Sequence, residues 1–209
     1  MKLQLALDLL DKDEAISVVK EVGEYFDIIE VGTSLLKLYG INIVSEIKQI
    51  HPHKDVFLDA KIIDGPEREA SLMAMSGTEY YSMLAVATDT AVTKVLNIAK
   101  KNNAKVIMDM QSVTEYKSRS EELKKLGVEY FCVHKNSDCG DNLEEAFSEF
   151  LDIKEITGAD ISIAGGINVE TLPTIKEKLN PDIVVIGGAV LKASGKKSVA
   201  MKMRTIADS

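Results

Sequence analysis

The chain has 209 residues, of which 45% are hydrophobic and 28% are charged, a composition typical of a globular protein with a substantial core. Its 25 basic and 33 acidic residues give a formal charge of −8, which argues against nucleic-acid binding, since that requires a basic patch. No uncharged apolar run is long enough to cross a membrane, and Asp8 lies too near the N-terminus for a signal peptide. The two cysteines, Cys132 and Cys139, lack the spacing of a zinc site and suggest a reducing compartment, so we expect a cytoplasmic protein.

Short apolar and β-branched runs recur along the chain, each of a length suited to a buried strand. Amphipathic stretches with helical spacing lie between them, such as residues 14–22 and 91–101. In chain order the predicted strands are LQLAL (3–7), DIIEV (27–31), VFLDA (56–60), YYSML (80–84), VIMDM (106–110), YFCVH (130–134), ISIAG (161–165) and IVVIG (183–187).

The eight strand runs begin at intervals of 22 to 31 residues, the length of a strand, a helix and two short loops. Strict alternation favours parallel strands with right-handed crossovers. An open doubly wound sheet and a closed (β/α)8 barrel both satisfy this pattern, and eight units with no spare element favour the TIM barrel. Because no linker or low-complexity segment interrupts the chain, we expect one domain over residues 1–209.

The C-terminal ends of the predicted strands carry acids, a base and glycines, and this is the end of a TIM barrel where active sites lie. Each residue alone also has an ordinary structural interpretation: Asp109 as a helix cap, Glu30 as a partner of Lys37, His134 as a buried histidine. Their convergence favours a functional site. The residues at these ends are Asp8, Glu30, Asp59 with Lys61, Asp109, His134, Gly165-Gly166 and Gly187-Gly188.

Three of these residues suggest specific chemistry. Asp59 and Lys61 are two positions apart, so on a strand they point to the same face. Glu30 and Asp59 come from neighbouring strands, and two converging carboxylates repel unless a cation or a proton lies between them. A hard, oxygen-ligated ion such as Mg²⁺ suits this pair, and a surface salt-bridge cluster is the alternative.

The glycine pairs predict a second subsite. Gly165-Gly166 and Gly187-Gly188 end the seventh and eighth strands, where TIM barrels frequently hold phosphate on backbone N–H groups. Tight turns are the alternative explanation for each pair. His134, at the end of the sixth strand, is a candidate general acid or base near neutral pH.

With these residues assembled, the sequence resembles the orotidine 5′-monophosphate decarboxylase superfamily and, within it, the 3-hexulose-6-phosphate synthase family. The likeness covers essentially the whole chain, and its signature is the D-x-K-x-x-D motif formed by Asp59, Lys61 and Asp64. Other matching stretches are LQLALDLLD at the start, DIIEVGTSLLK (27–37), VHKNSD (133–138), IAGGI (163–167) and VVIGGAV (184–190).

The resemblance implies a Mg²⁺-dependent aldolase that joins formaldehyde to D-ribulose 5-phosphate through a metal-bound enediolate. It implies that Glu30 and Asp59 bind the metal, that Lys61 stabilises the enediolate charge, and that His134 and Asp64 move protons. It also implies a homodimer in which the last motif aspartate serves the partner's site. Asp8 and Asp109 complete the expected catalytic set, and Gly165, Gly166, Gly187 and Gly188 are the expected phosphate-binding residues.

Two alternatives stay open. The first is a 3-keto-L-gulonate-6-phosphate decarboxylase, a related activity with the same metal and enediolate chemistry. The decarboxylases typically have Glu, Arg, Thr and Arg at four positions where this chain has Asp109, Ser137, Ala164 and Gly188, so all four favour the synthase. The second alternative is a non-catalytic sugar-phosphate-binding barrel, which would not require the metal and lysine positions.

Overall fold

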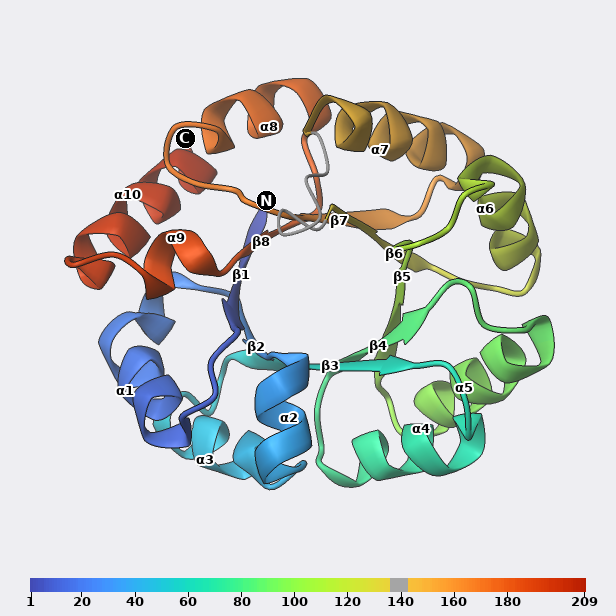
Figure 1. Cartoon of the computed structure of the whole chain (residues 1–209), viewed down its shortest axis with the longest axis horizontal. Helices are drawn as coiled ribbons and strands as arrows, with labels where there is room; N and C mark the ends of the chain where they lie inside the picture. The colour runs from blue at the N-terminus through green and yellow to red at the C-terminus, as the bar shows by residue number, and fades with distance from the viewer. Residues whose placement is uncertain (136–142) are drawn as a thin grey trace.

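The computed structural model describes residues 1–135 and 143–209. Eight parallel strands pair in chain order, and the first also pairs with the eighth, so the sheet closes into a barrel (Figure 1). This confirms the (β/α)8 barrel and excludes the open doubly wound sheet, which would leave two unpaired edges. The strands are β1 (Lys2–Leu7), β2 (Ile28–Val31), β3 (Asp55–Ile62), β4 (Tyr80–Leu84), β5 (Lys105–Asp109), β6 (Tyr130–His134), β7 (Asp160–Ala164) and β8 (Ile183–Ile186).

Helices ring the barrel on its outside (Figure 1). The longer ones are α1 (Lys12–Val22), α3 (Ile43–Ile50), α4 (Pro66–Met75), α5 (Asp89–Lys101), α6 (Tyr116–Lys125), α7 (Leu143–Thr157), α8 (Leu172–Leu179) and α10 (Lys196–Asp208). Three short elements add to the strict alternation expected from the sequence: the 3-10 helix η1 (Gly23–Tyr25), α2 (Thr33–Tyr39) and α9 (Gly188–Leu191). Helices α2 and α9 directly follow β2 and β8. None of the helices in the described part of the chain is long and apolar enough to cross a bilayer.

Helix α5 illustrates how the outer shell forms. Thr88 caps its N-terminus by accepting a hydrogen bond from the Ala91 N–H. Val92, Val95 and Ala99, spaced by three and four positions, are buried against the sheet. The apolar faces of the other helices cover the outside of the barrel in the same way, which forms the larger hydrophobic core.

The inside of the barrel is divided into an apolar layer and a polar layer. The apolar layer comprises Ile28, Phe57, Tyr80, Ile107, Cys132, Ala164 and Ile183. Because side chains alternate along a strand, the next inward position lies two residues further toward the C-terminal end. On five consecutive strands this position is polar: Glu30, Asp59, Ser82, Asp109 and His134. The packed layer therefore forms the floor of a polar cavity.

Candidate active site

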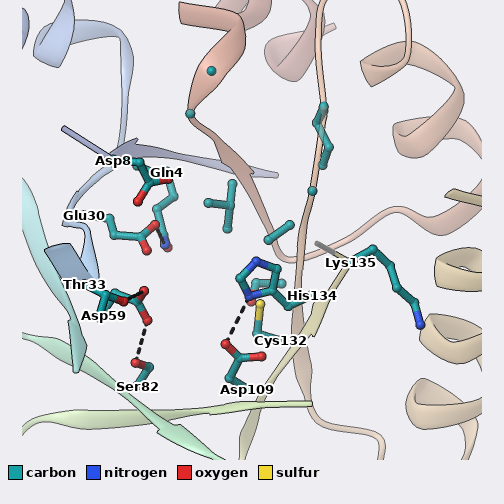
Figure 2. A pocket seen from close by; sticks show the side chains of 18 of the residues that line it. Gln4, Asp8, Glu30, Thr33, Asp59, Ser82, Asp109, Cys132, His134 and Lys135 are labelled. Atoms are coloured by element: carbon teal, nitrogen blue, oxygen red, sulfur yellow. Dashed lines mark hydrogen bonds and ion pairs between the residues drawn. The ribbon is translucent and has the colours of Figure 1, made fainter. Parts of the chain in front are cut away.

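A cavity of about 570 Å³ opens at the C-terminal end of the barrel (Figure 2). All predicted site residues line it except Asp64. They are Asp8, Glu30, Asp59, Lys61, Asp109, His134, Gly165, Gly166, Gly187 and Gly188. The structure therefore brings together side chains from β2, β3, β5 and β6 with backbone from the loops after β7 and β8.

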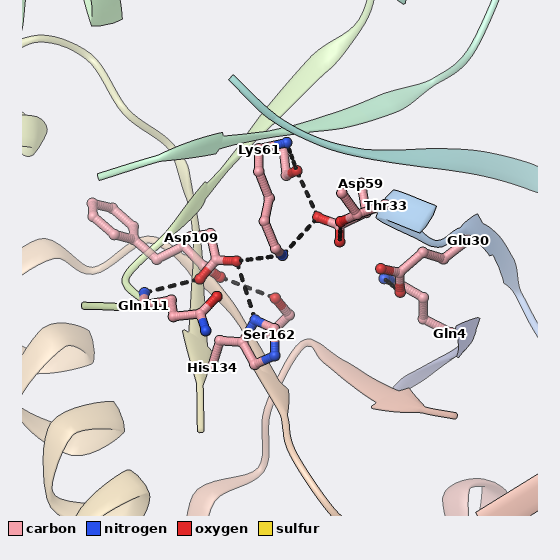
Figure 3. Close-up of polar contacts among 11 residues, drawn as sticks. Gln4, Glu30, Thr33, Asp59, Lys61, Asp109, Gln111, His134 and Ser162 are labelled. Carbon is pink, nitrogen blue, oxygen red and sulfur yellow. Dashed lines mark hydrogen bonds and ion pairs between the residues drawn. The ribbon is translucent and has the colours of Figure 1, made fainter. Parts of the chain in front are cut away.

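Lys61 lies between two carboxylates (Figure 3). Its Nζ is 2.9 Å from Oδ1 of Asp59 and 3.1 Å from Oδ2 of Asp109. Burial by itself would lower the pKa of Lys61, but the charges and hydrogen bonds of the two carboxylates outweigh it and raise the pKa above the ordinary value. Lys61 is therefore a fixed positive charge in the cavity at neutral pH.

Asp109 connects Lys61 to His134. Its Oδ2 also contacts His134 Nδ1 at 3.1 Å, and its Oδ1 accepts a hydrogen bond from the Gln111 N–H at 2.9 Å. Burial alone would raise the pKa of Asp109, but the hydrogen bond and charge of His134, the charge of Lys61 and the Gln111 N–H together lower it. An ionised Asp109 favours the proton on His134 Nδ1, which leaves Nε2 as the basic nitrogen. No residue in the described ranges hydrogen-bonds to Nε2, and the ring lines the cavity.

The end of β3 departs from a regular strand at Lys61. Its φ of +46° lies in the left-handed region, and the register between β3 and β4 shifts between Leu58 and Ile62. The Lys61 N–H donates to the Ser82 hydroxyl at 2.8 Å instead of to a strand carbonyl. Asp59 and Lys61 meet in one site as predicted, but this irregular backbone, rather than strand alternation alone, sets the direction of the lysine.

Ser82 is a site residue that the sequence interpretation missed. Its hydroxyl accepts from the Lys61 N–H and donates to Asp59 Oδ1 at 2.8 Å, and the residue is only 1% exposed. The Thr33 hydroxyl donates to the other oxygen of Asp59. The alternation of side chains could have identified Ser82. It lies two positions after Tyr80, which points inward, just as Asp59 lies two positions after Phe57.

Glu30 and Asp59 are both 7% exposed, so the surface salt-bridge alternative does not hold. Glu30 accepts a hydrogen bond from Gln4 Nε2 at 2.7 Å, and none of the contacts among the described residues joins it to Lys37. In the β2–β3 register Glu30 is level with Phe57, so Asp59 lies one inward position nearer the cavity mouth. Burial first, and then the negative charge of Asp59, raise the pKa of Glu30 well above its ordinary value.

Asp8 is a third carboxylate on this side of the cavity (Figure 2). Burial and the charge of Asp59 raise its pKa as well. A side chain at Gly32 would collide with the Asp8 carboxylate, and one at Gly187 would lie 3.4 Å from Asp8 Oδ2. Glycine at these two positions therefore leaves room for the Asp8 carboxylate beside the loops that follow β2 and β8.

The carboxylates on this side fit a hard cation. Lys61 neutralises Asp59 only in part and does not reach Glu30 in the described contacts. No group of three or more His, Cys, Asp or Glu side chains in residues 1–135 and 143–209 is arranged to hold a metal. Mg²⁺ does not need such a group, because it commonly keeps several waters and takes only one or two carboxylates from the protein.

The glycine loops offer backbone donors to the cavity. Gly165 and Gly166 have φ of +124° and +62°, and a side chain at Gly165 would collide with the carbonyl oxygen of Lys135. In the described part of the chain, nothing accepts a hydrogen bond from the N–H groups of Gly166, Gly188 or Ala189. Unpaired N–H groups on residues that line one cavity are suited to an anionic oxygen.

Asp64 is the predicted residue that lies apart from the others. It is exposed, and its Oδ1 accepts a hydrogen bond from the Gly65 N–H at 2.7 Å, just before α4. The adjacent Ile63 is 49% exposed. Asp64 is therefore not part of the cavity of its own chain.

Cys132 is buried in the apolar layer inside the barrel. Ser137 and Cys139 lie outside the described residues. Besides Ser82, the cavity lining includes polar residues that were not predicted: Gln4, Thr33, Ser34, Gln111, Lys135, Ser162, Asn168 and Lys192.

This chain is similar to known proteins in both sequence and fold. Residues 1–203 match the Orotidine 5′-phosphate decarboxylase / HUMPS family. Over 207 residues the chain is 37% identical to the 3-hexulose-6-phosphate synthase of Bacillus subtilis (strain 168), which covers 99% of this chain and 98% of the relative. The crystal structure of 3-hexulose-6-phosphate synthase from Salmonella typhimurium has a TM-score of 0.93 at 33% identity, covering 99% of this chain and 98% of that one. The 3-keto-L-gulonate-6-phosphate decarboxylase of Vibrio cholerae, with a TM-score of 0.85 at 22% identity and coverage of 99% and 97%, shares the fold.

Proposed function

This chain belongs to the Orotidine 5′-phosphate decarboxylase / HUMPS family, and from that premise we propose that it is a lyase of the hexulose-6-phosphate synthase type. It would add formaldehyde to D-ribulose 5-phosphate and form 3-hexulose 6-phosphate. The observation that carries the proposal is the cavity in which the Lys61 ammonium lies between Asp59 and Asp109, beside the glycine loops. The full-length likeness to synthases at 37% and 33% identity supports the choice of substrate.

The reaction requires a carbanion next to a carbonyl group. A proton leaves C1 of ribulose 5-phosphate, which gives an enediolate shared by C1 and C2. C1 then forms a bond to the formaldehyde carbon, and the former C=O electron pair moves to the formaldehyde oxygen, which takes up a proton. The site must therefore move a proton twice and stabilise negative charge once.

The residues of the cavity match these two tasks. We propose that Lys61 faces the developing enediolate charge, since its raised pKa keeps it protonated throughout. His134 Nε2 would accept the C1 proton, while the ionised Asp109 holds Nδ1 and stabilises the imidazolium that results. Asp109 thereby positions His134 and the Lys61 ammonium relative to each other.

We further propose that Glu30 and Asp59 hold Mg²⁺. The support is the chemistry of the pair: both carboxyl groups are buried, and burial together with the negative charge of Asp59 raises the pKa of Glu30. When bound there, the ion would polarise oxygens of the substrate and so favour loss of the adjacent proton. Gln4 would keep the Glu30 carboxylate oriented, through the hydrogen bond at 2.7 Å.

The quaternary structure is part of the proposal. We propose a homodimer in the cytoplasm in which Asp64 completes the partner's site. Its support is that Asp64 is exposed and outside its own cavity, with the half-exposed Ile63 beside it as apolar contact surface.

The test is a two-substrate assay with purified protein, Mg²⁺, ribulose 5-phosphate and formaldehyde. Formaldehyde should be consumed, and Lys61→Ala should lose at least about a thousandfold in kcat/KM while circular dichroism shows a retained fold. Lys202→Ala, an exposed lysine outside the cavity, is the matched control. Decarboxylation of 3-keto-L-gulonate 6-phosphate without formaldehyde consumption would identify the decarboxylase alternative. Phosphate-ester binding without any turnover would identify the non-catalytic alternative.

A further inference from the structure

In the described part of the cavity lining, carboxyl groups outnumber the lysines that are free to bind an anion, although the proposed substrate is a phosphate ester. Asp8, Glu30, Asp59 and Asp109 all line it. A phosphate monoester carries close to two negative charges at neutral pH, so a cation that is not already neutralised would strengthen its binding through a charge-assisted contact.

Of the cavity-lining cations among the described residues, two are already paired. Lys61 contacts Asp59 and Asp109. Lys135 makes an ion pair of 2.8 Å with the buried Glu149, and Figure 2 shows its side chain pointing away from the carboxylates. The third cation is Lys192, whose ammonium has no hydrogen-bond or ion-pair partner within the described part of the chain.

Lys192 lies beside Gly188, in the glycine loop that follows β8. It follows α9 directly, and its side chain runs back over Gly188: a Cβ atom added to that glycine would lie 3.7 Å from Lys192 Cε and 3.9 Å from Nζ. The two lysines that follow along the chain are engaged elsewhere. Lys196 donates to the Ala193 carbonyl at 3.4 Å, and Lys197 lies 3.6 Å from Glu24.

We propose that Lys192 is a specificity-determining residue that binds the phosphate group of the substrate, together with the N–H groups of Gly166 and Gly188. This inference rests on the proposed function for the identity of the ester, and extends it to a side chain that supplies the positive charge. Because Lys192 is exposed at the cavity edge and lies beyond the reacting groups, it contributes to binding the substrate and the transition state alike. Its loss should therefore act on KM more than on kcat.

The experiment compares wild type, Lys192→Gln, Lys192→Arg and Lys202→Gln. Lys202 is an exposed lysine on α10 outside the cavity, so its variant removes the same charge without touching the site. We expect Lys192→Gln to raise the KM for ribulose 5-phosphate about tenfold, with a much smaller change in kcat, because one charge-assisted contact is lost. Lys192→Arg should recover most of the affinity, and Lys202→Gln should match wild type.

A second measurement separates this inference from the proposed function. Calorimetric titration of each full-length variant with inorganic phosphate needs no turnover, and binding should weaken in Lys192→Gln by about the same factor as KM rises. If wild type consumes no formaldehyde but phosphate binding still depends on Lys192, the proposed reaction is wrong and the phosphate contact stands. If Lys192→Gln equals Lys202→Gln in both KM and phosphate affinity, the contact does not exist.

Discussion

Replacing Ser82 with alanine tests whether the irregular end of β3 positions the catalytic lysine. The Ser82 hydroxyl accepts from the Lys61 N–H and donates to Asp59 Oδ1, each at 2.8 Å, in a residue that is 1% exposed. The substitution leaves a backbone N–H at a left-handed residue without its acceptor and removes one donor from the Asp59 carboxylate. Leaving a buried donor unpaired costs about 1–3 kcal/mol, and a lost hydrogen bond to a charged group costs a similar amount.

These two losses share one hydroxyl and add only in part, so we expect Ser82→Ala to lower the free energy of unfolding by about 2–4 kcal/mol. For a chain of this length that corresponds to a fall in Tm of roughly 5–15 °C, measured by circular dichroism. Since Lys61 and Asp59 both lose their alignment, kcat should fall about 10- to 100-fold in the formaldehyde assay.

Ser162→Ala is the matched control. Ser162 is also buried and lines the same cavity, but its hydroxyl donates to the Phe131 carbonyl at 3.2 Å and contacts neither Asp59 nor Lys61. Its loss should cost about 1 kcal/mol and leave kcat nearly unchanged. If Ser82→Ala loses no more stability and no more activity than Ser162→Ala, the proposed role of Ser82 is wrong.

Three further predictions concern charge and assembly. Because the folded-state pKa of Glu30 is raised, its contribution to stability is present below the unfolded pKa of about 4.3 and is lost as pH rises through the folded value. Glu30→Gln should therefore have a higher Tm than wild type at neutral pH and lose that advantage near pH 4. If the Tm difference between the variant and wild type is the same at both pH values, this prediction is wrong. Chelation should abolish formaldehyde consumption, and Mg²⁺ should raise the Tm of wild type but not of Glu30→Gln; activity that survives exhaustive chelation would remove the metal from the mechanism. Finally, Asp64→Ala and Lys61→Ala, each inactive alone, should recover about a quarter of wild-type activity when unfolded and refolded together, since half of the dimers are mixed and each has one intact site. No recovery in mixtures that do contain mixed dimers would place Asp64 outside the partner's site.

The repeating sequence pattern was sufficient to predict the barrel. Side chains alternate along a strand and parallel strands need crossovers, so eight short apolar runs separated by amphipathic stretches fix both the strand direction and the helical outer shell. For the same reason, reading the strand ends identified Glu30, Asp59, Asp109 and His134 as members of one cavity. The short helices α2 and α9 were not foreseen, because four to seven residues carry too little periodicity.

The sequence by itself determined that Glu30, Asp59, Asp109 and His134 reach the C-terminal mouth of the barrel, because for these residues that depends only on strand position and the alternation of side chains. The tertiary structure alone decided how those residues are paired. Lys61 has a left-handed backbone, and its N–H donates to Ser82 on the next strand. One Asp109 oxygen contacts both Lys61 and His134. Each of these contacts joins residues 21 or more positions apart. Such contacts depend on register and on where the chain bends, and no local pattern encodes them. The same holds for Lys192, which stands out only once the partners of the other lysines in the cavity are known.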